Sequence, residues 1–137
     1  MSGKYSTYAG IACWLNKAGF STSTGVYNAS TYGYTGIRFW AKGTGSLIVV
    51  GQMASTEQTT YGGTCQLGTT CAGDSVNCGP LSTSTWTQFS VPFTNLKGGT
   101  VTPFDPTGIW SLEFQYYSAT SLGGASFDLW IDDLTFY

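Results

Sequence analysis

The chain consists of short segments in which apolar and polar residues alternate, and this alternation restricts it to β structure. Such runs occupy residues 8–15, 35–42, 46–53, 86–93, 109–117 and 125–137, with a weaker run at 25–30. Clusters of Gly, Ser, Thr, Asn or Pro separate the runs, and no segment keeps a sustained apolar period of 3.6 residues. The pattern predicts an all-β domain, specifically a β-sandwich of the jelly-roll kind with two antiparallel sheets.

Length and charge narrow the class of partner. A chain of 137 residues is expected to form a single domain, residues 1–137, with one core. Charged residues make up only 9% of it, and the net charge is −2. Because the five basic residues are scattered singly, the chain has no basic stripe that would bind phosphates or an anionic membrane. This surface suits a neutral partner, and we expect neither nucleic acid nor membrane binding.

A long segment, residues 54–84, lacks hydrophobic anchors and is predicted to be a loop. Loops beyond about 15 residues are uncommon in compact domains unless something orders them. Three of the four cysteines lie in this segment, at positions 65, 71 and 78, and the fourth is Cys13. Their spacing does not match zinc sites, and the chain has no histidine, so disulfides in an oxidising, extracellular compartment are the better interpretation. Four cysteines allow three pairings, and the alternative of a mobile loop with free thiols also remains open.

Strand alternation divides the side chains between core and surface. The residues predicted to point into the core are Ile11, Cys13, Leu15, Ile37, Phe39, Ala41, Leu112, Phe114, Tyr116, Phe127, Leu129 and Ile131. The phase must slip at Asp132 and Asp133 for Leu134 and Phe136 to return inward, which predicts a β-bulge there. We expect Trp86 and Trp110 to be covered, whereas Trp14, Trp40 and Trp130 fall on polar faces.

Exposed indole rings with amide, carboxylate and guanidinium groups between them match the requirements of a neutral sugar chain. Rings stack on the CH-rich faces of β-linked sugars, and polar groups pair with hydroxyls. The predicted carbohydrate-binding residues are Trp14, Arg38, Trp40, Tyr61, Glu113, Gln115, Tyr117, Asp128 and Trp130. The same residues also have purely structural interpretations, in which loops cover the rings and Arg38 forms a cross-strand ion pair with Glu113.

Two other function classes use the same residues. A small jelly-roll glycosidase needs two carboxyl groups about 5–10 Å apart, and Glu113 with Asp128 is the one plausible cross-sheet pair. An adhesion β-sandwich would bind a protein through the same aromatic patch. We expect binding without catalysis.

Four motifs from residue 36 onwards carry a family resemblance: GIRFWAKGTG, TWTQFSVPFTNL, IWSLEFQ and FDLWIDDLTFY. In this order and spacing they resemble the β-sandwich carbohydrate-binding modules attached to secreted bacterial cellulases and hemicellulases, particularly modules beside β-1,4-glucanases. The resemblance implies a non-catalytic, secreted module that binds plant cell-wall β-glucan on one sheet and targets an appended glycoside hydrolase to it. We also expect the chain to be a monomer.

The resemblance also implies bonds that residue patterns alone leave open. In many such modules the first Asp of the closing pair, here Asp132, ligates a structural calcium. GGTC followed by a cysteine six residues later resembles the stapled loop of these relatives, which implies a Cys65–Cys71 disulfide and leaves Cys13 for Cys78. The acidic first strand that supplies further calcium ligands in such modules is missing, because this chain begins MSGKYSTY.

Overall fold

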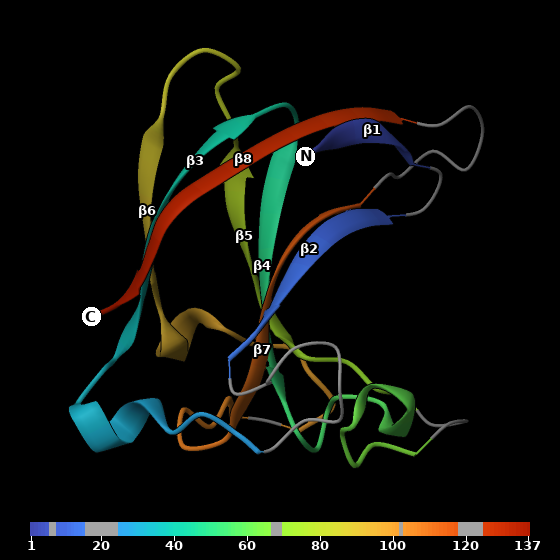
Figure 1. The fold of residues 1–137 in the computed structure, drawn as a ribbon, viewed down its shortest axis with the longest axis vertical. Coiled ribbons are helices and arrows are strands. Elements are labelled where there is room, and N and C mark those ends of the chain that lie inside the picture. Colours follow the sequence, from blue (N-terminus) through green and yellow to red (C-terminus); the bar gives the residue numbers. More distant parts are fainter. Residues whose placement is uncertain (6–7, 16–24, 67–69, 102, 118–124) are drawn as a thin grey trace.

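The structure, a computed structural model, is a β-sandwich of two four-stranded antiparallel sheets (Figure 1). It describes residues 1–5, 8–15, 25–66, 70–101, 103–117 and 125–137. The predicted fold class is therefore confirmed. No helix of the described part is long and apolar enough to cross a membrane.

The two sheets are built from strands that are not consecutive in the chain. Sheet one has the order β1-β8-β3-β6, and its strands are β1 (Ser2–Tyr5), β8 (Ala125–Phe136), β3 (Gly36–Gly43) and β6 (Thr87–Pro92). Sheet two has the order β2-β7-β4-β5, and its strands are β2 (Tyr8–Trp14), β7 (Ile109–Tyr117), β4 (Ser46–Met53) and β5 (Asp74–Pro80). The described residues also form 3-10 turns between strands, which are η1 (Ala29–Tyr32), η2 (Thr59–Tyr61) and η3 (Phe93–Asn95).

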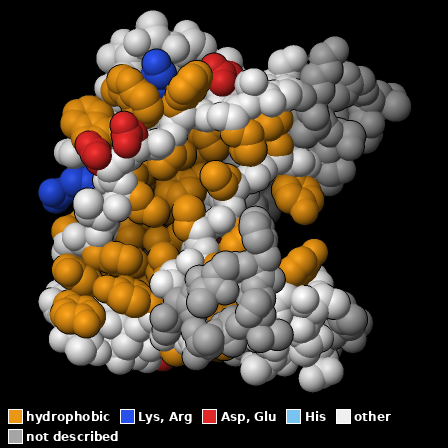
Figure 2. All heavy atoms as spheres, viewed as in Figure 1, with side chains coloured by type: hydrophobic (Ala, Val, Ile, Leu, Met, Phe, Trp, Pro, Cys, Tyr) orange, Lys and Arg blue, Asp and Glu red, His pale blue; other side chains and the backbone are white. Residues whose placement is uncertain are grey.

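The core fills the space between the inner faces of the sheets. Ile37, Phe39 and Ala41 of β3 are fully buried and oppose Leu112 and Phe114 of β7, as their alternation predicts. Of the other predicted core residues, Tyr116 and Leu129 are buried, and the following pack against the cluster: Phe127, Ile131, Cys13 and Leu15. Ile11 is 46% exposed on β2, an outer strand of sheet two, so its assignment to the core was wrong. Figure 2 shows hydrophobic side chains gathered in the middle of the molecule, while the few charged side chains in view lie mainly at the upper left.

Three local predictions were wrong. The supposed loop 54–84 contains β5, an edge strand that pairs with β4. Its inward positions are Asp74, Val76 and Cys78, and two apolar residues are too few to show a recognisable alternation. The strand β1 was missed because SGKY is short and polar. The weak run 25–30 forms no strand: Tyr27 makes an isolated bridge to Ile109, and η1 begins at Ala29.

The cysteines confirm one predicted disulfide and contradict the other. Cys65 and Cys71 are bonded, with their Cα atoms 6.0 Å apart. Cys13 and Cys78 are free thiols. They lie on β2 and β5, the two outer strands of sheet two, which three strand spacings, about 14 Å, separate. A disulfide tolerates no more than about 7 Å between Cα atoms, so the predicted Cys13–Cys78 bond is wrong.

The acidic pair in β8 forms the predicted bulge. Arg38 pairs with Thr135 and Trp40 with Asp132, so β8 has one residue more than β3 over this interval. Asp133 takes the extra place with a positive φ of 50°, and its N–H donates to Asp132 Oδ1 at 2.8 Å. The bulge lets Asp132 stay outside while Leu134 packs against the core.

Candidate functional site

The outer face of sheet two carries a cleft. Two adjoining hollows of about 260 and 420 Å³ share Tyr8, Tyr61, Glu113 and Gln115 in their linings, and so form one continuous depression. We call this depression the cleft. Its other polar and aromatic lining residues are Trp14, Gln52, Glu57, Gln58 and Ser75.

Strands β2 and β7 form one side of the cleft. In their antiparallel register Gly10 opposes Gln115 and Trp14 opposes Ser111, so these residues share the outer face. Gly10 keeps the floor open, because a Cβ there would lie 2.8 Å from the Phe114 carbonyl oxygen and 3.0 Å from Gln115 Cγ. Trp14 at the end of β2 is 40% exposed, which leaves a ring available beside the polar floor.

The stapled loop supplies the opposite wall. Tyr61 ends η2, and Gly62 follows it with φ 88°, a left-handed conformation that glycine adopts without strain. Gly63 passes against Glu57, where an added Cβ would meet the Glu57 carbonyl oxygen at 2.0 Å. The Cys65 N–H donates to that same carbonyl at 3.0 Å. The backbone bonds and the disulfide together hold Tyr61, which is 56% exposed, over the cleft.

A chain of polar side chains forms the floor. The Thr56 hydroxyl donates to Gln52 Oε1 at 2.8 Å, and the Gln52 side chain in turn hydrogen-bonds Glu113. The Gln115 amide donates to Glu113 Oε2 from the other side. Because Thr56 and Gln115 are themselves buried, the network fixes the Glu113 carboxylate in position before any ligand arrives.

Burial dominates the electrostatics of Glu113. Desolvation raises the pKa of this carboxyl group above its ordinary value of 4.5, and the hydrogen bonds from Gln52 and Gln115 offset part of that rise. A carboxylate held by two amides keeps lone pairs free to accept hydroxyl protons. The aromatic rings around it supply flat apolar surfaces, so the cleft can hold a molecule that has both hydroxyl groups and apolar faces.

The predicted binding residues do not form one surface. Trp14, Tyr61, Glu113 and Gln115 meet in the cleft. Tyr117 lies at the end of β7, opposite Tyr8, but its side chain is outside the described residues.

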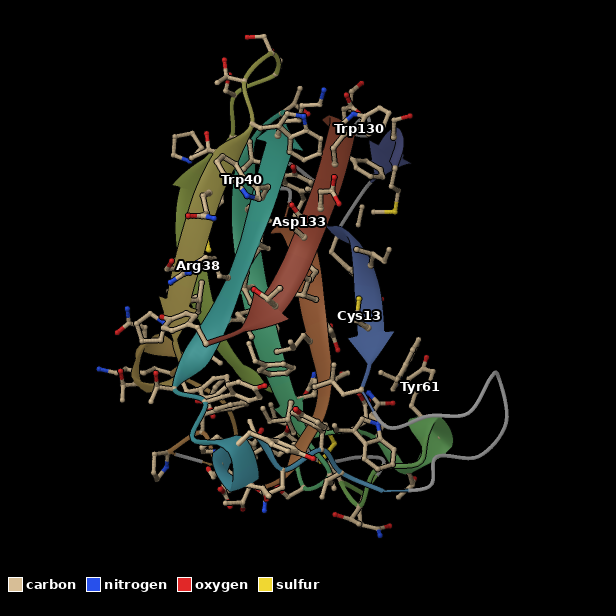
Figure 3. All side chains as sticks on the ribbon, turned by 60° about the vertical axis from the view of Figure 1, so that its left-hand side comes forward. Cys13, Arg38, Trp40, Tyr61, Trp130 and Asp133 are labelled. Atoms are coloured by element: carbon tan, nitrogen blue, oxygen red, sulfur yellow. A yellow bond between two sulfur atoms is a disulfide. The ribbon has the colours of Figure 1, made fainter. Side chains whose placement is uncertain are left out.

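The remaining four, Arg38, Trp40, Asp128 and Trp130, lie on sheet one, on the other side of the sandwich. Figure 3 shows Arg38, Trp40 and Trp130 along β3 and β8, whereas Tyr61 lies beyond the end of β2. The expectation that the predicted binding residues share one sheet was wrong. Strand alternation predicts that a residue points outward, but it does not predict to which sheet the residue belongs.

Two pairings that depended on a single surface are also wrong. Arg38 and Glu113 cannot form a cross-strand ion pair, since β3 and β7 belong to different sheets; the Arg38 Nε instead donates to the Ser90 hydroxyl at 3.3 Å. Asp128 is likewise on the sheet opposite Glu113, and it accepts a bond from the Trp130 indole N–H at 3.1 Å. The glycosidase hypothesis therefore loses its proposed carboxyl pair.

Sequence reasoning missed several cleft residues. Tyr8 is 62% exposed and has the same alternation phase as Trp14, so that phase could have revealed it. Gln52 could have been found from the outward phase of β4. Glu57 had no comparable signal, because only the fold of the stapled loop brings it to the cleft.

The site for calcium stays a prediction. Asp132 is exposed, and one of its carboxylate oxygens already accepts the Asp133 N–H. Among the described residues, no group of three or more His, Cys, Asp or Glu side chains is placed to hold a metal ion. Calcium usually takes six to eight oxygen ligands, so most ligands at Asp132 would have to be carbonyl groups or water.

Comparison with known families identifies the family of the chain. A family model described as carbohydrate binding domain 30 matches residues 3–137. No curated protein and no solved structure gives a significant match. Since the family match covers nearly the whole chain, the chain belongs to the carbohydrate binding domain 30 family and is a non-catalytic carbohydrate-binding domain.

Proposed function

We propose that this domain binds β-1,4-glucan chains of the plant cell wall in the cleft on sheet two and thereby brings an appended glycoside hydrolase to its substrate. Cellulose oligosaccharides, xyloglucan and mixed-linkage β-glucan are the proposed ligands. One observation carries the proposal: Tyr8, Trp14 and Tyr61 surround a polar floor made by Glu113 and Gln115.

The chemistry of β-linked glucose fits this arrangement. The hydroxyls of β-linked glucose are equatorial, so its ring presents two CH-rich faces that stack on aromatic side chains. Its hydroxyls point outward around the rim, where carboxylate and amide groups can pair with them. Few charges line the cleft beyond Glu57 and Glu113, which agrees with a neutral ligand.

The rings also set the expected strength of binding. A stacked sugar that removes about 50 Å² of apolar area from water contributes about 1–1.5 kcal/mol. Three such contacts plus a few hydrogen bonds, less the cost of ordering the chain, correspond to a Kd of about 10 μM to 1 mM. Weak binding suits a module that must release and rebind along a polymer.

We also propose that the domain is secreted and acts as a monomer. The Cys65–Cys71 disulfide supports secretion, because such bonds persist in oxidising compartments and are rare in the cytosol.

The test is electrophoresis in native gels that contain one polysaccharide each. Hydroxyethyl cellulose, xyloglucan and barley β-glucan are expected to retard the domain, and a starch gel is the control for linkage. Trp14→Ala should reduce the retardation without lowering the melting temperature appreciably. Unchanged migration of the wild type in every β-glucan gel would overturn the proposal, as would release of reducing sugar that disappears in Glu113→Gln.

A further inference from the structure

Sheet one carries a second aromatic surface, on the side of the sandwich opposite the cleft. Trp40, Trp86 and Trp130 are 36%, 36% and 51% exposed. Trp40 belongs to β3 and Trp130 to β8, and Trp86 directly precedes β6. We call these three residues the tryptophan face. The expectation that Trp86 is covered was wrong, since it stands at the exposed edge of the sheet.

Two rings of the tryptophan face, those of Trp86 and Trp130, are held in place by neighbouring side chains. The Lys42 ammonium nitrogen lies 5.0 Å from the Trp86 ring centroid and 5.2 Å from that of Trp130, so one cation contacts both indoles. The Trp130 indole N–H donates to Asp128 Oδ2. Trp86 and Trp130 then have less side-chain freedom to lose when a ligand binds.

Polar residues extend the face along the sheet. Trp40 on β3 pairs with Gln88 on one side and Asp132 on the other. One position further along the same side of the strand, Arg38 pairs with Ser90 and Thr135. Each row therefore places hydrogen-bonding groups beside or below an aromatic ring, the same combination that lines the cleft.

We propose that the tryptophan face is a second carbohydrate-binding site, which takes a neutral β-linked glycan and works independently of the cleft. The two surfaces share no residue. The domain would then hold two glycan chains, one on each side of the sandwich.

The exposed area favours a glycan over a protein partner. If a Trp side chain presents about 250 Å², the three exposed fractions correspond to about 300 Å² of ring surface. A stable protein interface needs about 800 Å² from each partner, and the residues around the rings are polar. An area of this size matches the faces of a few sugar rings.

The charges favour a neutral glycan over an acidic one. Arg38 and Lys42 lie on the face, but so do Asp128, Asp132 and Asp133. Positive and negative groups alternate over short distances, so no field of one sign attracts an ion. Such mixed groups can instead donate to and accept from hydroxyls.

Indole N–H signals in nitrogen-15 NMR spectra test the proposal, because each of the five tryptophans contributes one signal. The probe is cellohexaose, titrated into Trp14→Ala to about 10 mM, which covers the weak affinities expected of a few stacked rings. The signals of Trp40, Trp86 and Trp130 are expected to move together along one saturation curve. The buried Trp110 signal should stay in place and serves as the internal reference.

Each outcome decides between the sites. Absence of any shift at the tryptophan face while Trp14 of the wild type responds would overturn this proposal and leave the cleft intact. The reverse pattern would support the tryptophan face and overturn the cleft. Signals that move on dilution without sugar would show that a second copy of the chain covers the face, which also overturns the proposal. Trp130→Ala should abolish the shifts, and Tyr32→Ala, which removes an exposed ring on η1 outside both surfaces, should preserve them.

Discussion

The Trp14 ring is the part of the cleft whose contribution to binding can be worked out most directly. With 40% of its surface exposed, the side chain offers about 100 Å² to a ligand, if an indole presents about 250 Å². A sugar that covers half to all of this area gains about 1.2–2.5 kcal/mol at 25 cal/mol per Å². Trp14→Ala should therefore weaken binding by about 8-fold to 70-fold.

Isothermal titration with cellohexaose measures this loss. Tyr32→Ala is the matched control, because Tyr32 is a 67% exposed ring on η1 that lies on neither the cleft nor the tryptophan face. Its affinity should equal that of the wild type. Trp14→Phe should recover part of the loss, since a smaller ring still stacks. An affinity of Trp14→Ala within twofold of the wild type, with the fold intact, would refute the assignment of the ring to the cleft.

Three further predictions concern protons, thiols and calcium. Burial raises the pKa of Glu113, so the folded state holds this proton more tightly than the unfolded chain does. The free energy of unfolding, measured with urea, should therefore fall as the pH rises from 4.5 through the raised pKa, and Glu113→Gln should reduce this fall. Thiol titration in denaturant should find two reactive groups per chain, Cys13 and Cys78, and a count of zero would restore the second disulfide. If calcium binds at Asp132, a chelator should lower the melting temperature of the wild type but not of Asp132→Asn, and an unmoved wild type would remove the metal.

Much of the fold could be predicted because it depends on local alternation. Ile37, Phe39 and Ala41 are core residues for the same reason that Arg38 and Trp40 are not: successive side chains of a strand point to opposite sides. The bulge at Asp133 followed from the same rule, since the apolar phase of β8 could be kept in no other way. These features need no knowledge of which strands are neighbours.

The pairing of cysteines and the division of the site depend on strand order, which the sequence does not display. Cys13 and Cys78 both pack against the core, and a bond between them was expected because the Cys65–Cys71 disulfide leaves these two cysteines over. Only the order β2-β7-β4-β5 shows that they lie at opposite edges. Similarly, β5 places only two apolar residues, Val76 and Cys78, against the core, so its sequence resembles a loop.

The same topology explains why one predicted surface became two. Strands β7 and β8 follow each other in the chain, yet they belong to different sheets, so the chain crosses the sandwich between them. Each crossing reverses the side to which an outward residue points. Glu113 on β7 and Trp130 on β8 both point outward, and for this reason they face away from each other.

Two opposed sites would give the domain a property that neither site has alone, which is cross-linking. A monomer that holds one chain on each side should join soluble β-glucan molecules and make their solution turbid, with a maximum near equal numbers of sites and chains. Trp14→Ala and Trp130→Ala should each abolish the turbidity, although each variant still binds sugar at its remaining face. Tyr32→Ala should cross-link as the wild type does. Turbidity that survives in Trp130→Ala would mean that the domain joins glucan chains without the tryptophan face, and this would refute cross-linking by two opposed sites.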